Sequence, residues 1–439
     1  MASTTVTSSI FHRSLPKSYP TAVKGDGVYL VTSEGKRIFD GSSGAAVSCL
    51  GHGNREVIDA ICEQAQDLAF AHTSFFTSDP AEELAHFVLK RSADAFHKIL
   101  LLSPGSEANE SAFKLVRQYH VHNGQPERVY ITGRDSSYHG NTLGALAAGS
   151  NTLRRAVFEP ILSYAFQHVR RCFFQADSSG KSEVEYEDEL LAEYEVEFHR
   201  LSPQTIAAVV VEPAVGSTLG AVPATQTYLP RLIELYHKYG ILVIFDEVMC
   251  GMGRTETYHA WQGLGGVTPD LQTVGKAFVS NLMGRKVYDG FAEHSKGPGA
   301  FLSGHTFQGH SMACTGALAV QKILARDDLV ANCHLMGLKL RDSLKAELPK
   351  EFESGGGRLR GLGLFRAVDF GDMGKSFGGL LAPDVAAKCF ELGATVYLCS
   401  PAVDAILLCP PFIMTESQTV ELARILIQGL SGVMTLRRQ

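Results

Sequence analysis

The stretch Ile241-Leu-Val-Ile-Phe-Asp-Glu-Val248 places five apolar residues directly before two carboxylates. A short, continuous apolar run of this kind is typical of a strand that is buried on both faces of a sheet. Lys276 follows 30 positions after Asp246, directly behind a glycine in Leu271-Gln-Thr-Val-Gly-Lys276. The run therefore predicts an interior strand that carries an acid at its end, with an amine arriving from the next segment.

Similar apolar runs alternate with helical patterns over much of the chain. Strands are predicted at residues 98–103, 128–132, 206–212 and 241–246, and helices at 54–69, 80–91, 105–120 and 229–239. A short hairpin is predicted for residues 28–40. This alternation predicts an α/β fold with a mostly parallel sheet covered on both faces, in which ligands bind beyond the carboxyl ends of the strands.

Composition limits the classes of protein that remain. The chain has 439 residues, of which 45% are hydrophobic and 20% charged, and its formal net charge is -6. These values predict a soluble protein of two domains, and they give no reason to expect a nucleic acid or an acidic membrane as partner. Nine cysteines without a C-x-x-C pair predict reduced thiols, no metal site and a cytoplasmic location. No apolar run suggests a membrane span, and the Ser/Thr-rich first 20 residues are better explained as a frayed terminus than as a transit peptide.

Motifs for nucleotide binding and for hydrolysis are incomplete or missing. Gly251-Met-Gly-Arg254 and Gly361-Leu-Gly-Leu364 begin like dinucleotide fingerprints but lack the third glycine. The Gly275-Lys276 pair has neither the upstream glycine of a Walker loop nor the following Ser or Thr. The sequence contains no H-E-x-x-H and no G-x-S-x-G motif.

The remaining candidates fit one cofactor, pyridoxal 5'-phosphate. Lys276 offers an amine for a Schiff base, and Asp246 offers the acid that keeps a pyridine nitrogen protonated. Pro104-Gly105-Ser106, where a strand gives way to a helix, suits a phosphate. Tyr138 offers a ring to stack on a pyridine, and Glu212 is a second acid at a strand end. Each feature alone has an ordinary explanation as a helix cap, a packing residue or a surface lysine, but their combination in this order favours a shared site.

Several motifs together resemble the class-III aminotransferases, the ω-aminotransferase branch of the fold-type-I pyridoxal-phosphate enzymes. The similarity extends from about Gly25 to Pro411. The motifs that carry it are Gly105-Ser-Glu-Ala-Asn-Glu110, Tyr138-His-Gly140, Val211-Glu-Pro213, Phe245-Asp-Glu-Val-Met-Cys-Gly-Met-Gly-Arg-Thr255, Gly275-Lys276 and His305-Thr-Phe-Gln-Gly-His310.

The resemblance implies an architecture and a set of partners. It implies a large cofactor-binding domain over residues 51–315 and a smaller α+β domain built from residues 1–50 and 316–439. It also implies a homodimer whose active sites are shared between subunits. The reaction would move an amino group from an amine donor to a keto-acid acceptor.

The resemblance further implies a role for each residue in the motifs. Lys276 would be the Schiff-base lysine and general base, and Asp246 the partner of the pyridinium nitrogen. The other expected contacts are Val248 behind the ring, Tyr138 against its other face, Gly105 and Ser106 at the phosphate, Glu212 beside the cofactor, and Thr306 reaching the phosphate from the neighbouring subunit.

Two departures from the family pattern affect the expected activity. After Lys276 the chain reaches its next predicted helix early, by a shortfall of about 6–9 residues, the length of one strand. Loss of an internal strand would leave backbone groups unpaired. Either neighbouring segments pair again, or the catalyst is impaired, or the sequence reflects a misprocessed transcript.

The second departure concerns the substrate. No arginine precedes Pro410-Pro411 to clamp a carboxylate, and Gly216-Ser217 replaces the second glutamate that glutamate-using relatives often carry. A hydrophobic amine or ω-amino compound, with a keto acid such as pyruvate as acceptor, fits this sequence better. Arg254 and Arg366 are either anion contacts or residues with a surface or loop role.

Other activities share the same cofactor residues. A pyridoxal-phosphate mutase, racemase or decarboxylase would need an identical lysine and acid, and consumption of an amino acceptor separates it from an aminotransferase. A catalytically inactive homologue that serves as a dimeric binding partner is the third alternative.

Overall fold

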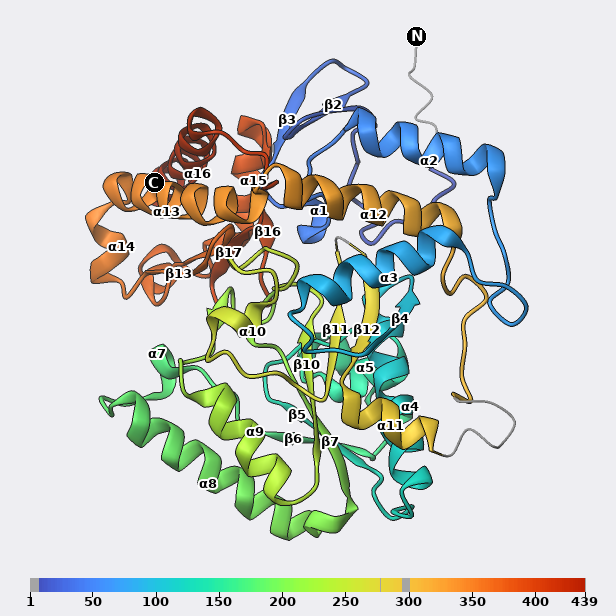
Figure 1. Cartoon of the computed structure of the whole chain (residues 1–439). Coiled ribbons are helices and arrows are strands. Elements are labelled where there is room, and N and C mark those ends of the chain that lie inside the picture. Colours follow the sequence, from blue (N-terminus) through green and yellow to red (C-terminus); the bar gives the residue numbers. More distant parts are fainter. Residues whose placement is uncertain (1–7, 277, 294–300, 439) are drawn as a thin grey trace.

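A seven-stranded sheet in the order β4-β12-β11-β10-β7-β5-β6 organises the larger half of the molecule (Figure 1). The computed structural model describes residues 8–276, 278–293 and 301–438. In this sheet β12 is antiparallel to both of its neighbours, and the other strands share one direction. The strands are β4 (Lys98–Leu102), β5 (Tyr130–Arg134), β6 (Phe166–Val169), β7 (Ile206–Val211), β10 (Leu242–Glu247), β11 (Leu271–Val274) and β12 (Val279–Met283).

Helices cover both faces of this sheet because β7 and the first four residues of β10 are apolar, so that both of their faces must be buried. In β10, Val243 and Phe245 join the core beneath α3 (Asp79–Arg91), α8 (Glu183–Leu201) and α9 (Tyr228–Lys238). The alternate residues Leu242 and Ile244 join the core on the other face, beneath α4 (Gly105–His122) and α11 (Arg285–Ala292). Every residue of β7 and β10 is buried. The predicted α/β fold with a mostly parallel, doubly covered sheet is therefore confirmed.

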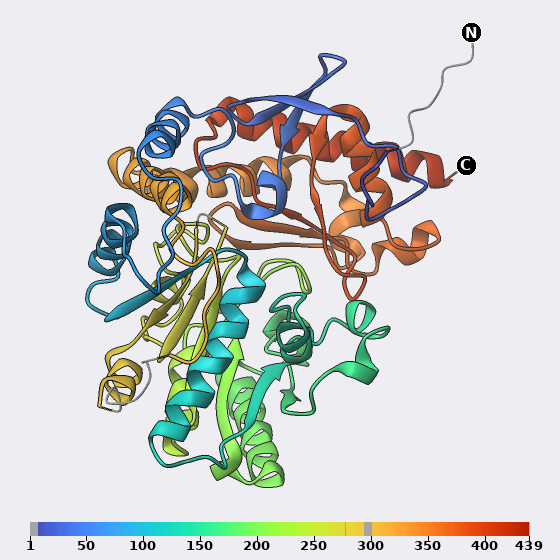
Figure 2. The same ribbon diagram turned by 90° about the vertical axis from the view of Figure 1, so that its right-hand side faces the viewer.

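The second half combines both ends of the chain, as Figure 2 shows from the side. β3 (Arg37–Asp40) pairs in parallel with β15 (Ala394–Thr395), so that Phe39 lies opposite Ala394. The sheets there are β1-β2-β3-β15 and β13-β14-β17-β16. Their other strands are β1 (Ala22–Asp26), β2 (Tyr29–Thr32), β13 (Arg358–Leu362), β14 (Phe365–Asp369), β16 (Tyr397–Leu398) and β17 (Ala405–Leu408).

The remaining elements connect these sheets or cover them. The small sheet β8-β9 joins Ala214–Val215 to Val222–Pro223. The other helices are α1 (Ser43–Ala46), α2 (Arg55–Asp67), α5 (Leu143–Ala148), α6 (Thr152–Arg155), α7 (Phe174–Asp177), α10 (Ala260–Gly263), α12 (Ser311–Arg326), α13 (Leu329–Glu347), α14 (Lys350–Ser354), α15 (Ala382–Leu392) and α16 (Glu416–Arg438).

α12 connects the two halves of the molecule. Its residues Cys314 and Leu318 belong to the core of the larger half, whereas Ile323 and Leu324 belong to the core of the smaller half. The predicted boundary between residues 315 and 316 falls inside this helix. The division into residues 1–50, 51–315 and 316–439 stays a prediction.

α16 is the one described helix that is long and apolar enough to cross a membrane, a property that the sequence alone did not reveal. Half of its apolar stretch is buried. Leu422, Leu426 and Leu430 belong to the core of the smaller half, where they pack among side chains from α13 and α15. Core helices commonly have this composition, so the apolar character of α16 is explained by its packing.

The expected loss of a strand after Lys276 is wrong. β12 lies at residues 279–283 and pairs with β11 on one side and β4 on the other. What is short is the connection, because only residues 275–278 separate β11 from β12. The strand was missed because its sequence, Val279-Ser-Asn-Leu-Met283, places two polar residues where an interior strand is expected to be apolar.

Candidate active site

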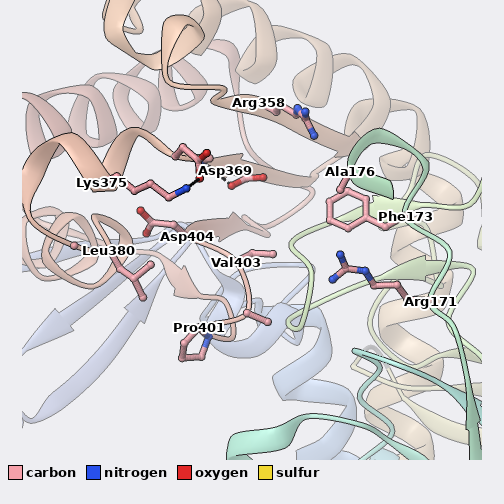
Figure 3. Close-up of a pocket in the computed structure, with 15 residues that line it drawn as sticks. Arg171, Phe173, Ala176, Arg358, Asp369, Lys375, Leu380, Pro401, Val403 and Asp404 are labelled. Carbon is pink, nitrogen blue, oxygen red and sulfur yellow. Dashed lines mark hydrogen bonds and ion pairs between the residues drawn. The ribbon is translucent and has the colours of Figure 1, made fainter. Parts of the chain in front are cut away.

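Charged side chains line a pocket between α7 and the sheet β13-β14-β17-β16 (Figure 3). They are paired with other groups of the protein. Arg171 binds Asp177 at 2.9 Å, and Lys375 binds Asp372 at 2.8 Å. Asp404 accepts two backbone N–H groups at 2.8 Å. These interactions give the charged side chains structural roles within the protein. The candidate residues lie elsewhere, at the edge of the central sheet.

Three chain segments carry the candidate residues to the carboxyl edge of that sheet. Asp246 is the fifth of the six residues of β10, and Gly105 begins α4 shortly after β4. Lys276 lies two residues beyond β11. Because β4, β10 and β11 run in the same direction, their carboxyl ends meet at one edge, where open α/β sheets bind ligands.

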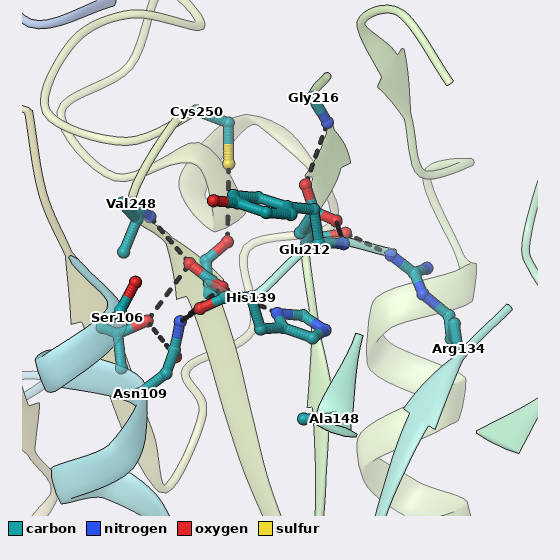
Figure 4. A network of polar contacts seen from close by, with 12 residues as sticks. Ser106, Asn109, Arg134, His139, Ala148, Glu212, Gly216, Val248 and Cys250 are labelled. Atoms are coloured by element: carbon teal, nitrogen blue, oxygen red, sulfur yellow. Dashed lines mark hydrogen bonds and ion pairs between the residues drawn. The ribbon is translucent and has the colours of Figure 1, made fainter. Parts of the chain in front are cut away.

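Asp246 belongs to a buried hydrogen-bond network with Asn109, His139 and Val248, all three of which are labelled in Figure 4. Its carboxyl group is 4% exposed. Its Oδ2 lies 2.7 Å from His139 Nδ1 and accepts from Asn109 Nδ2 at 2.9 Å. Its Oδ1 accepts the backbone N–H of Val248 at 3.0 Å. Donors on both oxygens stabilise the charged form of a carboxyl group and fix its orientation.

Thr273 determines how much of this carboxylate stays available. Its Oγ1 lies 3.1 Å from Asn109 Oδ1 and 3.3 Å from Asp246 Oδ1. A hydroxyl has one proton, and donation to the nearer amide oxygen completes the bonding of Asn109. A lone pair then remains on Asp246 Oδ1, which suits one further donor such as a protonated pyridine nitrogen.

Two glycines make room for Val248. A Cβ placed on Gly105 or on Gly275 would lie 2.6 Å from Val248 Cγ1, which is closer than side-chain atoms approach. Since Val248 directly follows the Asp246 strand, its methyl groups can occupy this position only because both neighbours are glycine. An apolar floor suited to one face of an aromatic ring is thereby formed beside the acid.

The start of α4 offers the features of an anion site. Its N-cap, Pro104, makes no side-chain capping bond, so first-turn N–H groups stay available. Ser106 Oγ accepts the backbone N–H of Asn141 at 3.0 Å. Gly140 adopts φ +141°, and a Cβ on it would lie 2.5 Å from Ser106 Oγ. The position of Ser106 therefore requires a glycine at 140.

Glu212 acts through the backbone of Tyr138. Its Oε1 accepts from the Tyr138 N–H and its Oε2 from the Gly216 N–H, each at 3.0 Å. Arg134 Nη2 donates to the Glu212 backbone carbonyl at 2.5 Å. Burial raises the pKa of the Glu212 carboxyl. This acid holds the chain that carries Tyr138, whose ring is half-buried at the site.

Lys276 occupies a tight turn beside this network. Its φ of +70° lies in the left-handed region, a conformation that costs a non-glycine residue about 1–2 kcal/mol. Desolvation lowers the pKa of its amine, while Cys409 and Asp246 act in the opposite direction. A lowered pKa increases the fraction of neutral amine, which is the form that attacks a carbonyl carbon or accepts a proton.

Three further residues named from the sequence lie outside this cluster, and for Thr306 this is consistent with its expected contact to the neighbouring subunit. Thr306 is exposed and lies in the segment before α12, where the adjacent His305 contacts Ser111 of α4 at 3.2 Å. Arg254 donates to the carbonyls of Leu364 and Pro410. Arg366 likewise donates to backbone carbonyls of its own turn. Both arginines therefore have structural partners, although Nη2 of the buried Arg254 has none among the described residues.

Three residues of the network received no role from sequence reasoning. His139 and Asn109 lie within the quoted motifs, but nothing in those motifs indicates that both bind Asp246. Thr273 had a weak signal, because it interrupts an apolar strand in Leu271-Gln-Thr-Val274. Among the residues that the structure describes, no group of three or more His, Cys, Asp or Glu side chains could hold a metal ion.

Comparison with known proteins agrees with this geometry. The family "Aminotransferase class-III" matches residues 12–430. An uncharacterized aminotransferase of Schizosaccharomyces pombe is 35% identical over 97% of this chain and 95% of its own. A putrescine–pyruvate aminotransferase of Pseudomonas aeruginosa is 28% identical over 91% of this chain and 88% of its own. The solved ω-transaminase of Pseudomonas jessenii in complex with PMP superimposes with a TM-score of 0.89 and 27% identity, covering 95% of this chain and 93% of that one.

Proposed function

The chain belongs to the class-III aminotransferases, and on that premise we propose that it transfers an amino group from an amine or ω-amino compound to a keto acid such as pyruvate. The enzyme is dependent on pyridoxal 5'-phosphate. The observation that carries the proposal is the half-buried Lys276 amine at the same sheet edge as Asp246, whose carboxylate retains one lone pair.

The residues present fit this cofactor. Val248 and Tyr138 would enclose its ring, the start of α4 with Ser106 would bind its phosphate, and Asp246 would hold a proton at the ring nitrogen. When bound, the cofactor supplies a reactive carbonyl carbon and a ring that accepts electrons. With the cofactor bound, the Lys276 amine would act as the general base that accepts the proton from the donor carbon at its Nζ.

The C-terminal segment supports the proposed substrate class. Leu407, Leu408 and Cys409, which lead into Pro410-Pro411, are fully buried and uncharged. Gly216 follows the Glu212 strand and binds the Glu212 carboxylate through its backbone. Neither segment offers a cation for a second carboxylate, so an amine or an ω-amino donor fits better than glutamate. The name of the Pseudomonas aeruginosa relative, a putrescine–pyruvate aminotransferase, agrees with this choice.

A homodimer with shared active sites is part of the same proposal. Phe75 is 79% exposed and Phe307 58% exposed, and ring contacts through Phe70 and His72 join them into one exposed aromatic cluster. An exposed apolar cluster of this kind is typical of a protein–protein interface. Phe307 directly follows Thr306, the residue proposed to contact the phosphate bound by the other subunit. Sedimentation velocity tests the dimer, and weaker cofactor affinity in Thr306→Ala tests the shared site.

The decisive test is covalent labelling of Lys276. Protein incubated with the cofactor is expected to turn yellow, and borohydride reduction should attach the cofactor irreversibly to the peptide that contains Lys276. The Lys276→Ala variant should lose both signals, while Lys322→Ala, which changes an exposed lysine of α12, should keep them. Retention of the yellow band in Lys276→Ala would contradict the assignment.

A panel of amines with pyruvate then tests the reaction. Alanine formation at the expense of pyruvate is expected with hydrophobic amines and ω-amino compounds. Labelled enzyme that releases carbon dioxide or isomerises its substrate, without consuming pyruvate, would instead indicate a decarboxylase, racemase or mutase.

A further inference from the structure

Arg154 lies beside Tyr138 and has no acidic partner among the described residues. It belongs to the short helix α6 (Thr152–Arg155) and is exposed. Its guanidinium carbon lies 4.9 Å from the centre of the Tyr138 ring, within cation–π distance. Its Nη1 donates to Asn141 Oδ1 at 3.3 Å. It therefore lies between the proposed ring-stacking residue and the loop that contacts Ser106.

The guanidinium group of the adjacent Arg155, in contrast, has a carboxylate and backbone carbonyls as partners. Arg155 binds Glu159 at 3.0 Å and also donates to the backbone carbonyls of Ala147 and Gly149. Arg154 has only an amide oxygen and an aromatic ring, and no carboxylate of the described residues lies within ion-pair distance of it. Its contact with Asn141 is long and neutral, so a stronger acceptor can replace it.

A guanidinium presents parallel N–H groups that match the two oxygens of a carboxylate. The proposed acceptor is a keto acid, and its carboxylate requires a cation near the site. The segment before Pro410 supplies none, and Arg254 and Arg366 donate to backbone carbonyls. On the basis of the proposed function, we propose that Arg154 binds the carboxylate of the keto-acid acceptor and so determines acceptor specificity.

The same chemistry has a second source, because the cofactor phosphate also carries oxyanions. Asn141, the partner of Arg154, contacts Ser106 through its backbone N–H, so a phosphate bound at Ser106 would also lie near this arginine. The phosphate already has Ser106 and the start of α4, and the cations whose charge acts on Tyr138 are Arg154 and, more weakly, Arg13. The two sources are distinguished by separate measurements of cofactor affinity and acceptor affinity.

The test compares Arg154→Gln with Arg154→Lys and with a control, Arg55→Gln, which removes a charge from the exposed surface of α2. The KM for pyruvate is expected to rise about 10–100-fold in Arg154→Gln, with little change in kcat, because a charge-assisted bond is lost. The KM for pyruvate of Arg154→Lys should lie between those of the wild type and Arg154→Gln, since lysine keeps the positive charge but loses the paired N–H groups of the guanidinium. The KM for propanal, a neutral acceptor of similar size, should stay unchanged in all variants.

Binding without turnover provides an independent measurement. Propanoate lacks the keto group, and its dissociation constant for the cofactor-loaded enzyme should increase by the same factor as the pyruvate KM in Arg154→Gln. Thermal melting verifies that each variant is folded. Equal losses for pyruvate and propanal, or a tenfold loss of cofactor affinity with unchanged propanoate binding, would overturn the proposal. A wild-type enzyme that binds propanoate through Arg154 but forms no alanine would refute the proposed function instead.

Discussion

β10 and β12 lie on either side of β11 in the same sheet. The end of β10 and the middle of β12 both carry buried polar side chains. At the end of β10, the oxygens of Asp246 accept hydrogen bonds from a helix, a loop and its own turn. In β12, Asn281 is fully buried, and neither its Oδ1 nor its Nδ2 has a hydrogen-bond partner among the described residues. The hydroxyl of Ser280 is in the same situation.

The difference shows that burial of a polar group does not by itself indicate a functional site. Thr273 lies between the two strands, opposite Asn281 in the sheet and within the Asp246 network. Its hydroxyl is oriented toward Asn109, and Asn281 gains nothing from it. An unpaired buried polar group costs about 1–3 kcal/mol. β12 tolerates this cost because its backbone pairs with strands on both sides.

The largest expected effect is on kcat, and it follows from replacing Asp246, whose carboxylate has hydrogen-bond partners. Asp246→Asn removes the charge that would hold the ring nitrogen protonated, and we expect kcat to fall about 10²–10³-fold, the usual loss when a preorganised electrostatic contact is removed. Steady-state kinetics with saturating cofactor measures this. An activity within threefold of the wild type would show that the buried acid is only structural.

The next prediction concerns Asn109, which is replaced by valine; the same replacement at Asn281 is the last prediction below. Asn109 donates to Asp246 and to the His139 carbonyl and accepts from Thr273. Asn109→Val leaves these groups unpaired, and we expect the free energy of unfolding to fall by about 3 kcal/mol. Urea denaturation of the protein without cofactor measures it. A neutral substitution would mean that the network contributes little to stability.

The opposite face of β11 offers a pH-dependent test. Gln272 donates to His259 Nδ1, and His259 Nε2 lies 2.8 Å from Ser92 Oγ. Burial lowers the pKa of His259 to about 3. Because the unfolded chain binds a proton below about pH 6.5 and the folded chain does not, stability should decrease as the pH falls from 6.5 toward 3, by about 2 kcal/mol at pH 5.

His259→Gln should remove this part of the pH dependence, although it lowers stability at neutral pH. The exposed His86 of α3 provides the control, and His86→Gln should leave the profile unchanged. Urea melts between pH 5 and pH 8 measure both variants. An unaltered slope in His259→Gln would place the acid sensitivity in other groups.

The smallest effect is expected at Asn281, whose side chain has no partner among the described residues. Here the substitution should raise stability instead of lowering it. Asn281→Val replaces two unsatisfied polar atoms by a side chain that suits a buried strand, so the free energy of unfolding should rise by about 1 kcal/mol. Activity should stay at the wild-type level. A loss of stability similar to that of Asn109→Val would show that Asn281 has partners, such as bound water.

Sequence reasoning identified the parts of the site that depend on local pattern. The apolar run before Asp246, the glycine before Lys276 and the strand-to-helix change at Gly105 all predicted their positions at one edge of a sheet, and the alternation of strands and helices predicted the fold. The strand β12 was missed for the same reason, because the prediction relied on apolar pattern and Ser280 and Asn281 lack it.

Local pattern is readable in a linear chain because a strand or helix is a property of neighbouring residues. Hydrogen-bond partners are different: Asn109 and Asp246 are separated by 137 positions, and His139 and Asp246 by 107. Their meeting depends on the order of strands in the sheet, which no short segment encodes. Folding in three dimensions therefore decided which buried polar groups are paired around Asp246, and it placed Arg154 beside the ring of Tyr138.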